Sequence, residues 1–344
     1  MLKNYRNYEA FKQKFKDDSI IVVGKNGAGK TNLLEAIHLL STGKSSRARY
    51  DRDLINYDEK FCTVGGVIER TDGTTEMQLQ VIKEDGDSNR SKKKYKLNKV
   101  FKTYKEFIGK FNSVLFMPED IRLLTGSPSR RRNYLDDVIK QTDTQYKKAV
   151  IDYIKAVRRR NRILEKIGDT SVGKDYLDYW TNKILEEGQY IQEKREGLIK
   201  YFEKRLSKYS KDLNTKEAEV NIKYKPSLIS KERFSEYKNK EIEARTTLIG
   251  PHRDDFSIDF DRYNISEFGS RGQQRSTLLA LKMCEIDYIE YNNKERPVLL
   301  LDDIFSELDM KHQESVLEII PKQQTIITCT ELPHFINGFQ KIFL

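Results

Sequence analysis

A glycine-rich loop near the N-terminus constrains the fold of this chain more than any other feature. Residues 24–31 read Gly-Lys-Asn-Gly-Ala-Gly-Lys-Thr and match the pattern G-x-x-x-x-G-K-[ST] without a mismatch. The loop follows the short β-branched run Ile20–Val23 and precedes an apolar pattern with helical spacing. Because glycines let successive backbone N–H groups turn toward phosphate oxygens at a helix N-terminus, this unit predicts a nucleoside triphosphate site.

Every residue of the loop is a candidate nucleotide contact, and two of them also have chemical roles. The predicted contacts are Gly24, Lys25, Asn26, Gly27, Ala28, Gly29, Lys30 and Thr31. Lys30 is a catalytic candidate because its ammonium can reach the β- and γ-phosphates. The Thr31 hydroxyl is a candidate ligand of Mg²⁺.

A second apolar strand ends in two carboxylates. Val298–Leu301 runs directly into Asp302 and Asp303. We expect Asp302 to hold the Mg²⁺ and Asp303 to orient or deprotonate the attacking water, as a catalytic residue. Two acids after a strand can also be a solvated strand end. The intact phosphate loop in the same chain favours the catalytic interpretation.

The spacing of apolar residues differs between the first and last thirds of the chain and its middle. Residues 1–125 and 246–344 alternate strand-like and helical segments, with the segment Phe61–Ile82 predicted to split at Gly65-Gly66. No glycine or proline interrupts Ser129–Ile167, and a second amphipathic stretch runs from Lys174 to Leu213. We therefore expect an α/β fold whose sheet strands flank an antiparallel helical arm, joined near Gly168–Gly173.

The distribution of charge indicates a polyanionic partner. The formal net charge is +10 for the chain, and by count it is +7 over residues 1–125, +9 over 126–245 and −6 over 246–344. A basic front and middle favour nucleic acid as the partner. Lysine-rich helices that are merely solvated would give the same counts, so charge alone leaves both interpretations open.

Composition excludes several classes of protein. Mean hydropathy is −0.73, and no stretch approaches the eighteen apolar residues of a membrane span. Cys62, Cys284 and Cys329 lie far apart, which leaves neither a disulfide framework nor a paired-cysteine metal site. No signal-peptide pattern opens the chain, so we expect a soluble, cytoplasmic protein with no membrane partner.

Taken together, the motifs resemble those of the ABC-type ATPases. Ser270-x-Gly272-Gln273, at the start of a predicted helix, looks like their signature motif, although by itself it reads as an ordinary helix cap. Leu301-Asp302-Asp303 looks like their Walker B motif, and the polar turn Ser306–Asp309 looks like their D-loop.

More narrowly, the chain resembles the RecF family, which is related to SMC heads. The most discriminating blocks are Phe116–Asp120, Gly126–Arg132 and Gly250–Asp255, and the likeness runs the whole length. It implies an ABC-type ATPase head of residues 1–125 and 246–344, with 126–245 as a mostly helical lobe II. Arg6 would touch a nucleotide phosphate.

The resemblance also implies a function. Two heads would close on ATP as an ATP-dependent homodimer, and Ser270, Gly272 and Gln273 of one subunit would contact the nucleotide of the other. The dimer would bind single-stranded DNA and gapped duplex in replication, recombinational repair and SOS induction. With RecO and RecR, it would help to load RecA.

Three basic clusters are the candidate DNA contacts, since lysine and arginine bind phosphates without reading sequence. They are Lys92, Lys93 and Lys94; Arg130, Arg131 and Arg132; and Arg158, Arg159 and Arg160. The alternative for each cluster is a solvated face.

The chain departs from the wider ABC pattern in ways that matter. Asp303 stands where transporter-type proteins carry glutamate, so we expect slow hydrolysis that acts as a timer. No switch histidine follows residues 325–328, where Thr328 or Thr330 lies instead, and Glu119 or Asp120 would replace the missing Q-loop glutamine. The chain begins close to Asn4, which suggests that part of the first strand is missing.

Two other functions fit parts of the sequence. One is an ATPase head that works with a separate nuclease, although such heads carry much longer insertions than the roughly 120 residues here. The other is the soluble ATPase subunit of a transporter, which would leave the basic arm unexplained. We expect no nuclease activity, because no acidic cluster lies beyond the Walker B turn.

Overall fold

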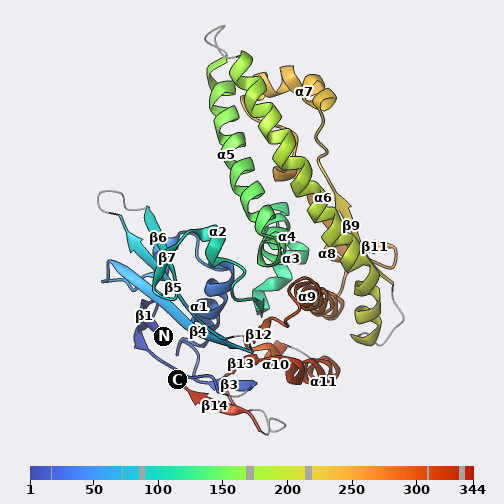
Figure 1. Ribbon diagram of the computed structural model, residues 1–344. Helices are drawn as coiled ribbons and strands as arrows, with labels where there is room; N and C mark the ends of the chain where they lie inside the picture. The colour runs from blue at the N-terminus through green and yellow to red at the C-terminus, as the bar shows by residue number, and fades with distance from the viewer. Residues whose placement is uncertain are drawn as a thin grey trace. The chain divides into compact units, whose positions relative to one another are not determined.

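A computed structural model describes residues 1–16, 18–71, 73–84, 90–167, 174–213, 219–307, 310–332 and 338–344 (Figure 1). The chain divides into two units. Unit 1 comprises Met1–Asp120 and Glu285–Leu344, and unit 2 comprises Ile121–Cys284. The predicted joint at Gly168–Gly173 and the end of the predicted D-loop, 308–309, lie outside the described residues.

The strands around the phosphate loop form a parallel sheet in unit 1. Its order is β14-β3-β13-β12-β8, and all neighbours are parallel. The strands are β3 (Ser19–Val23), β8 (Ser113–Phe116), β12 (Val298–Leu301), β13 (Thr325–Cys329) and β14 (Gln340–Phe343). Near-continuous apolar runs form such strands because both faces of a parallel sheet are covered. Parallel strands also bring the ends of β3, β13 and β12 to one edge.

A second sheet of unit 1 is antiparallel, in the order β2-β1-β4-β5-β6-β7. Its strands are β1 (Leu2–Tyr5), β2 (Tyr8–Phe11), β4 (Phe61–Arg70), β5 (Gly73–Lys83), β6 (Ser91–Leu97) and β7 (Val100–Lys102). The predicted break at Gly65-Gly66 is wrong, because β4 runs through both glycines in register with Gln78 and Met77. A Cβ on Gly66 would lie 3.2 Å from Leu40 Cδ1, so the glycine lets the strand approach a helix closely.

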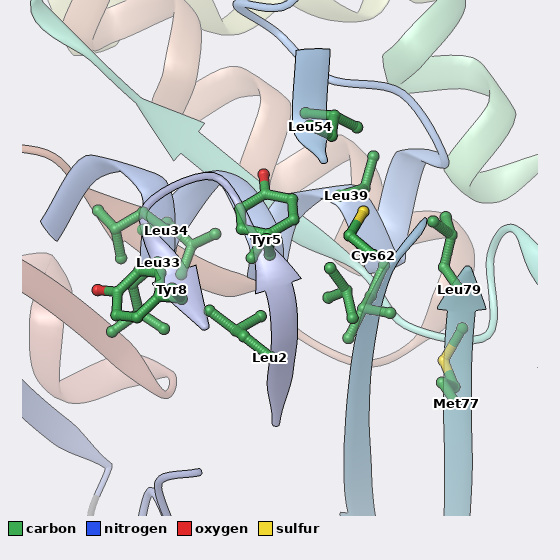
Figure 2. Close-up of a cluster of buried hydrophobic side chains, with 14 of the residues drawn as sticks. Leu2, Tyr5, Tyr8, Leu33, Leu34, Leu39, Leu54, Cys62, Met77 and Leu79 are labelled. Atoms are coloured by element: carbon green, nitrogen blue, oxygen red, sulfur yellow. The ribbon is translucent and has the colours of Figure 1, made fainter. Parts of the chain in front are cut away.

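That helix is α1 (Lys30–Thr42), which packs against both sheets. Leu33, Leu34 and Leu39 of α1 are buried. Figure 2 shows them beside side chains of the antiparallel sheet, among them Tyr5, Tyr8, Cys62, Met77 and Leu79. Ile20, Leu300 and Ile326 of the parallel sheet belong to the same core. This core fixes the helix that carries the phosphate loop.

Short helices complete unit 1. They are α2 (Tyr104–Phe107), α10 (Ile304–Glu307), α11 (Met310–Ile319) and 3-10 turns at Asp51–Leu54, Pro118–Ile121 and Ile320–Lys322.

Unit 2 is mostly helical, with a three-stranded antiparallel sheet of order β11-β10-β9. Its strands are β9 (Val220–Lys225), β10 (Asp255–Phe260) and β11 (Tyr263–Asn264). Its helices are α3 (Arg122–Thr125), α4 (Pro128–Thr142), α5 (Thr144–Ile167), α6 (Lys174–Leu213), α7 (Lys231–Ala244), α8 (Ile265–Phe268) and α9 (Arg271–Asn293). A 3-10 turn spans Pro251–Arg253. The last residues of α9, from Glu285 on, belong to unit 1. The long helices α5 and α6 lie side by side (Figure 1). In the described ranges, every helix is too short or too polar to cross a membrane.

The first helix of the predicted arm is broken at Asp143, although no glycine or proline marks the break. Asp143 is extended, at φ −127° and ψ 110°, between α4 and α5. Its Oδ1 accepts a hydrogen bond from the Tyr146 backbone N–H at 2.8 Å, and its Oδ2 lies 2.9 Å from Lys194 Nζ. An aspartate that caps a helix in this way competes with helix continuation.

A buried ion network joins the helices of unit 2. Arg195 on α6 pairs with Asp136 of α4 at 2.8 Å and with Asp254 at 2.9 Å. Asp254 also accepts hydrogen bonds from Gln192 and the Tyr224 hydroxyl. Buried charges need such pairing, so the network holds α4 and α6 against the segment that precedes β10.

Candidate functional site

The phosphate loop in unit 1 is braced by the turn between β1 and β2. The Tyr8 hydroxyl donates to the Gly29 carbonyl at 3.0 Å, and Asn7 Nδ2 donates to the Ala28 carbonyl at 3.2 Å. Gly29 has φ +108°, and a Cβ there would lie 2.7 Å from Asn7 Nδ2. Only glycine combines that backbone conformation with so close an approach.

The Lys30 ammonium is held inside the loop. Its Nζ donates to the carbonyls of Gly24 at 2.6 Å and Lys25 at 3.1 Å, and the residue is 7% exposed. The backbone of Lys25, Asn26 and Gly27 forms the exposed rim of the loop. An anion cradled there would meet the N-terminus of α1 and a lysine together.

The two predicted metal ligands meet at the sheet edge. Thr31 Oγ1 donates to Asp302 Oδ2 at 2.8 Å, which joins residues 271 positions apart. Thr328 Oγ1 donates to the other carboxylate oxygen, Oδ1, at 2.7 Å. A hydroxyl and a carboxylate are hard oxygen donors that fit Mg²⁺. Mg²⁺ beside phosphates commonly takes one or two ligands from the protein, and Thr31 and Asp302 would be those ligands here. The described residues contain no cluster of three or more His, Cys, Asp or Glu that could hold a metal ion.

Burial raises the pKa of the Asp302 carboxyl, against the lowering effect of hydrogen bonds from Thr328 and Thr31. The negative charge of the Glu119 carboxylate also raises this pKa. Asp120, the other candidate for the Q-loop position, accepts a hydrogen bond from the Met117 backbone N–H at 3.0 Å. Glu119 and Asp120 both stay candidates for the Q-loop position.

Asp303 has a left-handed backbone, with φ +46°. Its N–H donates to Thr328 Oγ1 at 2.9 Å, so the Thr328 hydroxyl links both acids. Among residues with a side chain, aspartate and asparagine adopt this conformation most readily, and strained residues of this kind gather at functional sites. The sequence singled out Thr328 only because it lies where a switch histidine would be expected. In the structure, its hydroxyl makes a hydrogen bond with each of the two acidic residues.

Arg6 forms an ion pair inside unit 1. Its guanidinium pairs with Glu35 through Nε at 3.1 Å and Nη2 at 3.0 Å. Glu35 is 1% exposed and also accepts hydrogen bonds from the Tyr5 and Ser45 hydroxyls. Arg6 therefore neutralises a buried carboxylate, and its contact with a nucleotide phosphate stays a prediction. No sequence signal marked Asn7 or Tyr8 as supports of the loop, or Glu35 as the partner of Arg6.

The signature residues begin α9, in unit 2. Ser270 Oγ accepts a hydrogen bond from the Gln273 N–H at 3.3 Å, and Gln273 Oε1 accepts one from the Ser270 N–H at 2.8 Å. This is a capping box at an exposed helix N-terminus. A Cβ on Gly272 would find only Ser270 Oγ, at 4.0 Å. The fold of the chain itself therefore leaves room beside Gly272.

The lysine cluster on β6 is split by strand alternation. Lys92 and Lys94 are exposed. Lys93 points to the other face of the sheet, where its Nζ lies 2.5 Å from Asp51 Oδ1 and donates to the Gly43 carbonyl at 2.8 Å. The Lys93 ammonium therefore has partners within the protein. Lys92 and Lys94 remain candidate DNA contacts on the exposed face.

The two arginine clusters of unit 2 are also divided. Arg130, Arg158 and Arg159 are exposed. Arg131 makes a two-pronged pair with Asp255, at 2.6 and 2.9 Å, and Arg132 donates to the Asp254 carbonyl at 2.9 Å.

Arg160 is 2% exposed and pairs with Glu241 at 2.6 Å. Burial of Arg160 leaves its guanidinium no surface to offer to DNA. Arg131 and Arg132 are partly exposed, and their contacts with DNA stay predictions.

Comparison with known proteins decides the family. The profile of the RecF/RecN/SMC N terminal domain matches residues 1–342. The DNA replication and repair protein RecF of Bacillus cereus (strain G9842) is 38% identical, over 96% of this chain and 91% of the relative. The chain belongs to the RecF family. The RecF protein of Bacillus thuringiensis (strain Al Hakam) has the same identity and coverage.

Solved structures agree with the RecF assignment. A structure described as the recombination mediator protein RecF-ATP in the RecFOR pathway has a TM-score of 0.89 at 31% identity, covering 98% of this chain and 92% of the other. The Smc head domain of Pyrococcus furiosus has a TM-score of 0.52 at 20% identity, covering 96% and 88%, which shows the fold alone. The predicted fold class, an ABC-type ATPase head with an inserted helical lobe, is confirmed.

The raised pKa of Asp302 gives a prediction about stability. A carboxyl whose pKa is higher in the folded protein destabilises the fold once it is ionised, at pH values above its ordinary pKa. We expect Asp302→Asn to raise the apparent midpoint of thermal unfolding at pH 7, because asparagine removes the buried charge. This gain should vanish as the pH falls below the ordinary pKa of an aspartate carboxyl, where Asp302 is protonated as well. Scanning fluorimetry at a series of pH values measures it. The exposed Asp58→Asn is the control, and an equal or lower midpoint for Asp302→Asn at pH 7 contradicts the prediction.

Proposed function

We propose that this chain is an ATP-dependent DNA-binding protein of DNA replication and recombinational repair. The observation that carries the proposal is the 2.8 Å hydrogen bond from Thr31 to Asp302, which joins the phosphate loop to the second acidic strand. A phosphate loop and an acidic strand end that meet in this way form the reaction centre of nucleotide hydrolases with this motif. The relatives named RecF, one of them described with ATP, support ATP as the nucleotide.

The described contacts give each residue of the site a task. Residues 24–31 hold the phosphates with backbone N–H groups, and Lys30 adds a positive charge from within the loop. Thr31 and Asp302 would hold Mg²⁺, which when bound neutralises charge on the phosphates. Asp303 orients the attacking water, and the Thr328 hydroxyl fixes its backbone. Asp303 is one methylene shorter than glutamate, so hydrolysis is slow and the protein works as a switch.

ATP controls dimerisation in this proposal. The exposed N-terminus of α9 presents Ser270, Gly272 and Gln273, and the open space beside Gly272 allows close approach by a second copy. A helix N-terminus is suited to an anion such as the γ-phosphate. Each ATP would then lie between the loop of one copy and the α9 terminus of the other, in heads formed by residues 1–125 and 246–344.

DNA is the partner that the exposed cations favour. Lys92, Lys94, Arg130, Arg158 and Arg159 remain available after the internally paired residues are removed. They would bind phosphates of single-stranded DNA and gapped duplex without reading sequence. By family resemblance, the protein acts with RecO and RecR to help load RecA at gaps, during repair and SOS induction.

Binding to a gapped duplex tests the proposed function. We expect fluorescence anisotropy to report binding that tightens with ATP but not with ADP, and that weakens as salt rises because counterions are released. Binding that ignores the nucleotide contradicts the switch. Absence of binding under every condition contradicts DNA as the partner and favours a transporter subunit.

Asp303→Asn tests the hydrolytic role. Asparagine tolerates the left-handed backbone at this position, so the fold should persist while the carboxylate is lost. We expect turnover of ATP to fall by about 100-fold or more, the usual contribution of a general base, with ATP binding retained. Phosphate release and nucleotide binding, measured on the same preparations, separate the two effects. Equal turnover in variant and wild type removes Asp303 from the mechanism.

Ser270→Arg tests the shared site. The arginine would fill the space that the γ-phosphate of the facing copy needs, so ATP binding should persist while ATP-driven dimerisation is lost. Light scattering with and without ATP measures the dimer, and Ser235→Arg, at an exposed position of α7 in the same unit, serves as a control for the added charge. A Ser270→Arg dimer that still forms with ATP contradicts the two-copy site.

A further inference from the structure

Two exposed aromatic side chains lie against one another in unit 2. Tyr263 of β11 is 63% exposed, and Phe268, the last residue of α8, is 69% exposed. Their ring centroids are 5.9 Å apart, and the ring planes are inclined at 58°. Single exposed apolar residues are ordinary, whereas a joined apolar surface marks a candidate interaction site. The function proposed above gives this aromatic pair no role.

Charged and polar residues flank the aromatic pair in the chain. Arg262 and Glu267, next to the two rings in sequence, are exposed, and so are Ser270 and Arg271. Both signs of charge are therefore present beside an apolar centre. An apolar centre with a polar rim is the arrangement of protein–protein interfaces, in which aromatic residues carry much of the binding energy.

The corner between α8 and α9 holds the aromatic pair in a fixed relation to the start of α9. Ile265 is 1% exposed, and its carbonyl accepts hydrogen bonds from the Gly269 N–H at 3.2 Å and from Gln274 Nε2 at 3.1 Å. A Cβ on Gly269 would lie 2.6 Å from the same carbonyl oxygen, so glycine allows the tight corner. Because the corner is already ordered, a partner that binds there has little ordering to induce.

The position of the aromatic pair identifies its partner. Phe268 precedes Ser270 by two residues, and two residues of chain span at most about 7 Å. In the two-copy site proposed above, Ser270 contacts the nucleotide held by the other copy. A side chain that starts within about 7 Å of that contact lies at the edge of the same interface. The surface that meets the aromatic pair therefore belongs to a second copy of this chain.

We propose that Tyr263 and Phe268 form an apolar anchor of the ATP-dependent dimer and become buried against the second copy. The proposal rests on the two-copy site and adds to it an apolar contact that the phosphate loop and Ser270 do not supply. The triphosphate makes the dimer depend on the nucleotide, and the aromatic pair contributes affinity, because burial of aromatic surface is strongly favourable.

A tryptophan placed in the aromatic pair reports its burial directly. The chain has one tryptophan, Trp180, so Trp180→Phe combined with Phe268→Trp leaves a single reporter. We expect its emission maximum to move to shorter wavelength with ATP and to stay unchanged with ADP. Tyr291→Trp with Trp180→Phe is the control and should show no shift. Position 291 is exposed and lies 20 residues after Arg271 on α9, or about 30 Å along the helix.

Ser270→Arg in the reporter protein distinguishes a second copy from the same chain. This substitution should prevent dimerisation while ATP still binds, so we expect it to abolish the shift. A shift that persists in a protein that light scattering shows to be monomeric means that the ring is covered within one copy, and this overturns the proposal. A dimer that forms with ATP without any shift also overturns it, while the two-copy site stands.

Phe268→Ser measures the contribution of the ring. We expect the dissociation constant of the ATP dimer to rise at least tenfold, as for an aromatic residue at the centre of an interface. ATP binding and the midpoint of thermal unfolding should stay unchanged, because the ring is exposed in the single copy. Tyr291→Ser should leave the dimer unaltered. An unchanged dissociation constant for Phe268→Ser overturns the proposal alone, and a wild-type chain that stays monomeric with ATP overturns the two-copy site as well.

Discussion

The burial of α1 between two sheets is the constraint on which the rest of unit 1 depends. Its leucines face the antiparallel sheet on one side and the parallel sheet on the other. Each fully buried leucine stabilises the fold by about 1.5–3 kcal/mol relative to exposure. The helix is therefore fixed along its whole length. Its N-terminus receives the phosphate loop, and its C-terminus ends at Gly43, whose left-handed backbone stops the helix.

The same burial explains why polar supports gather around α1. Glu35 lies on the buried helix and would be an unpaired charge without Arg6, Tyr5 and Ser45. The buried carboxylate of Asp302 is satisfied in a similar way by the hydroxyls of Thr31 and Thr328. In both places, a carboxylate stays in the interior because donors from distant parts of the chain converge on it. Residues that the resemblance would assign to ligand binding can thus serve the fold.

Part of the candidate site can be predicted from the sequence, and particular residues show where such prediction fails. The phosphate loop and the pair Asp302 and Asp303 are recognisable because each is a local pattern next to an apolar strand. The basic clusters are less informative, since a run of like charges does not tell which members find partners. Lys93 turns inward by strand alternation, and Arg160 is buried against Glu241. Neither fact is visible without the tertiary structure.

The sequence by itself determined the family, because its motif blocks resemble those of RecF proteins. It also determined the α/β fold with a helical insertion, and the loop and acids of the candidate site, because these depend on short-range spacing and apolar periodicity. Only the tertiary structure decided that Arg6 pairs with Glu35, that Asp143 breaks the first helix of the arm, and that Arg160 is buried against Glu241. These features bring together residues from separate segments. Their energies depend on burial and on which charges meet, and local sequence carries no record of either.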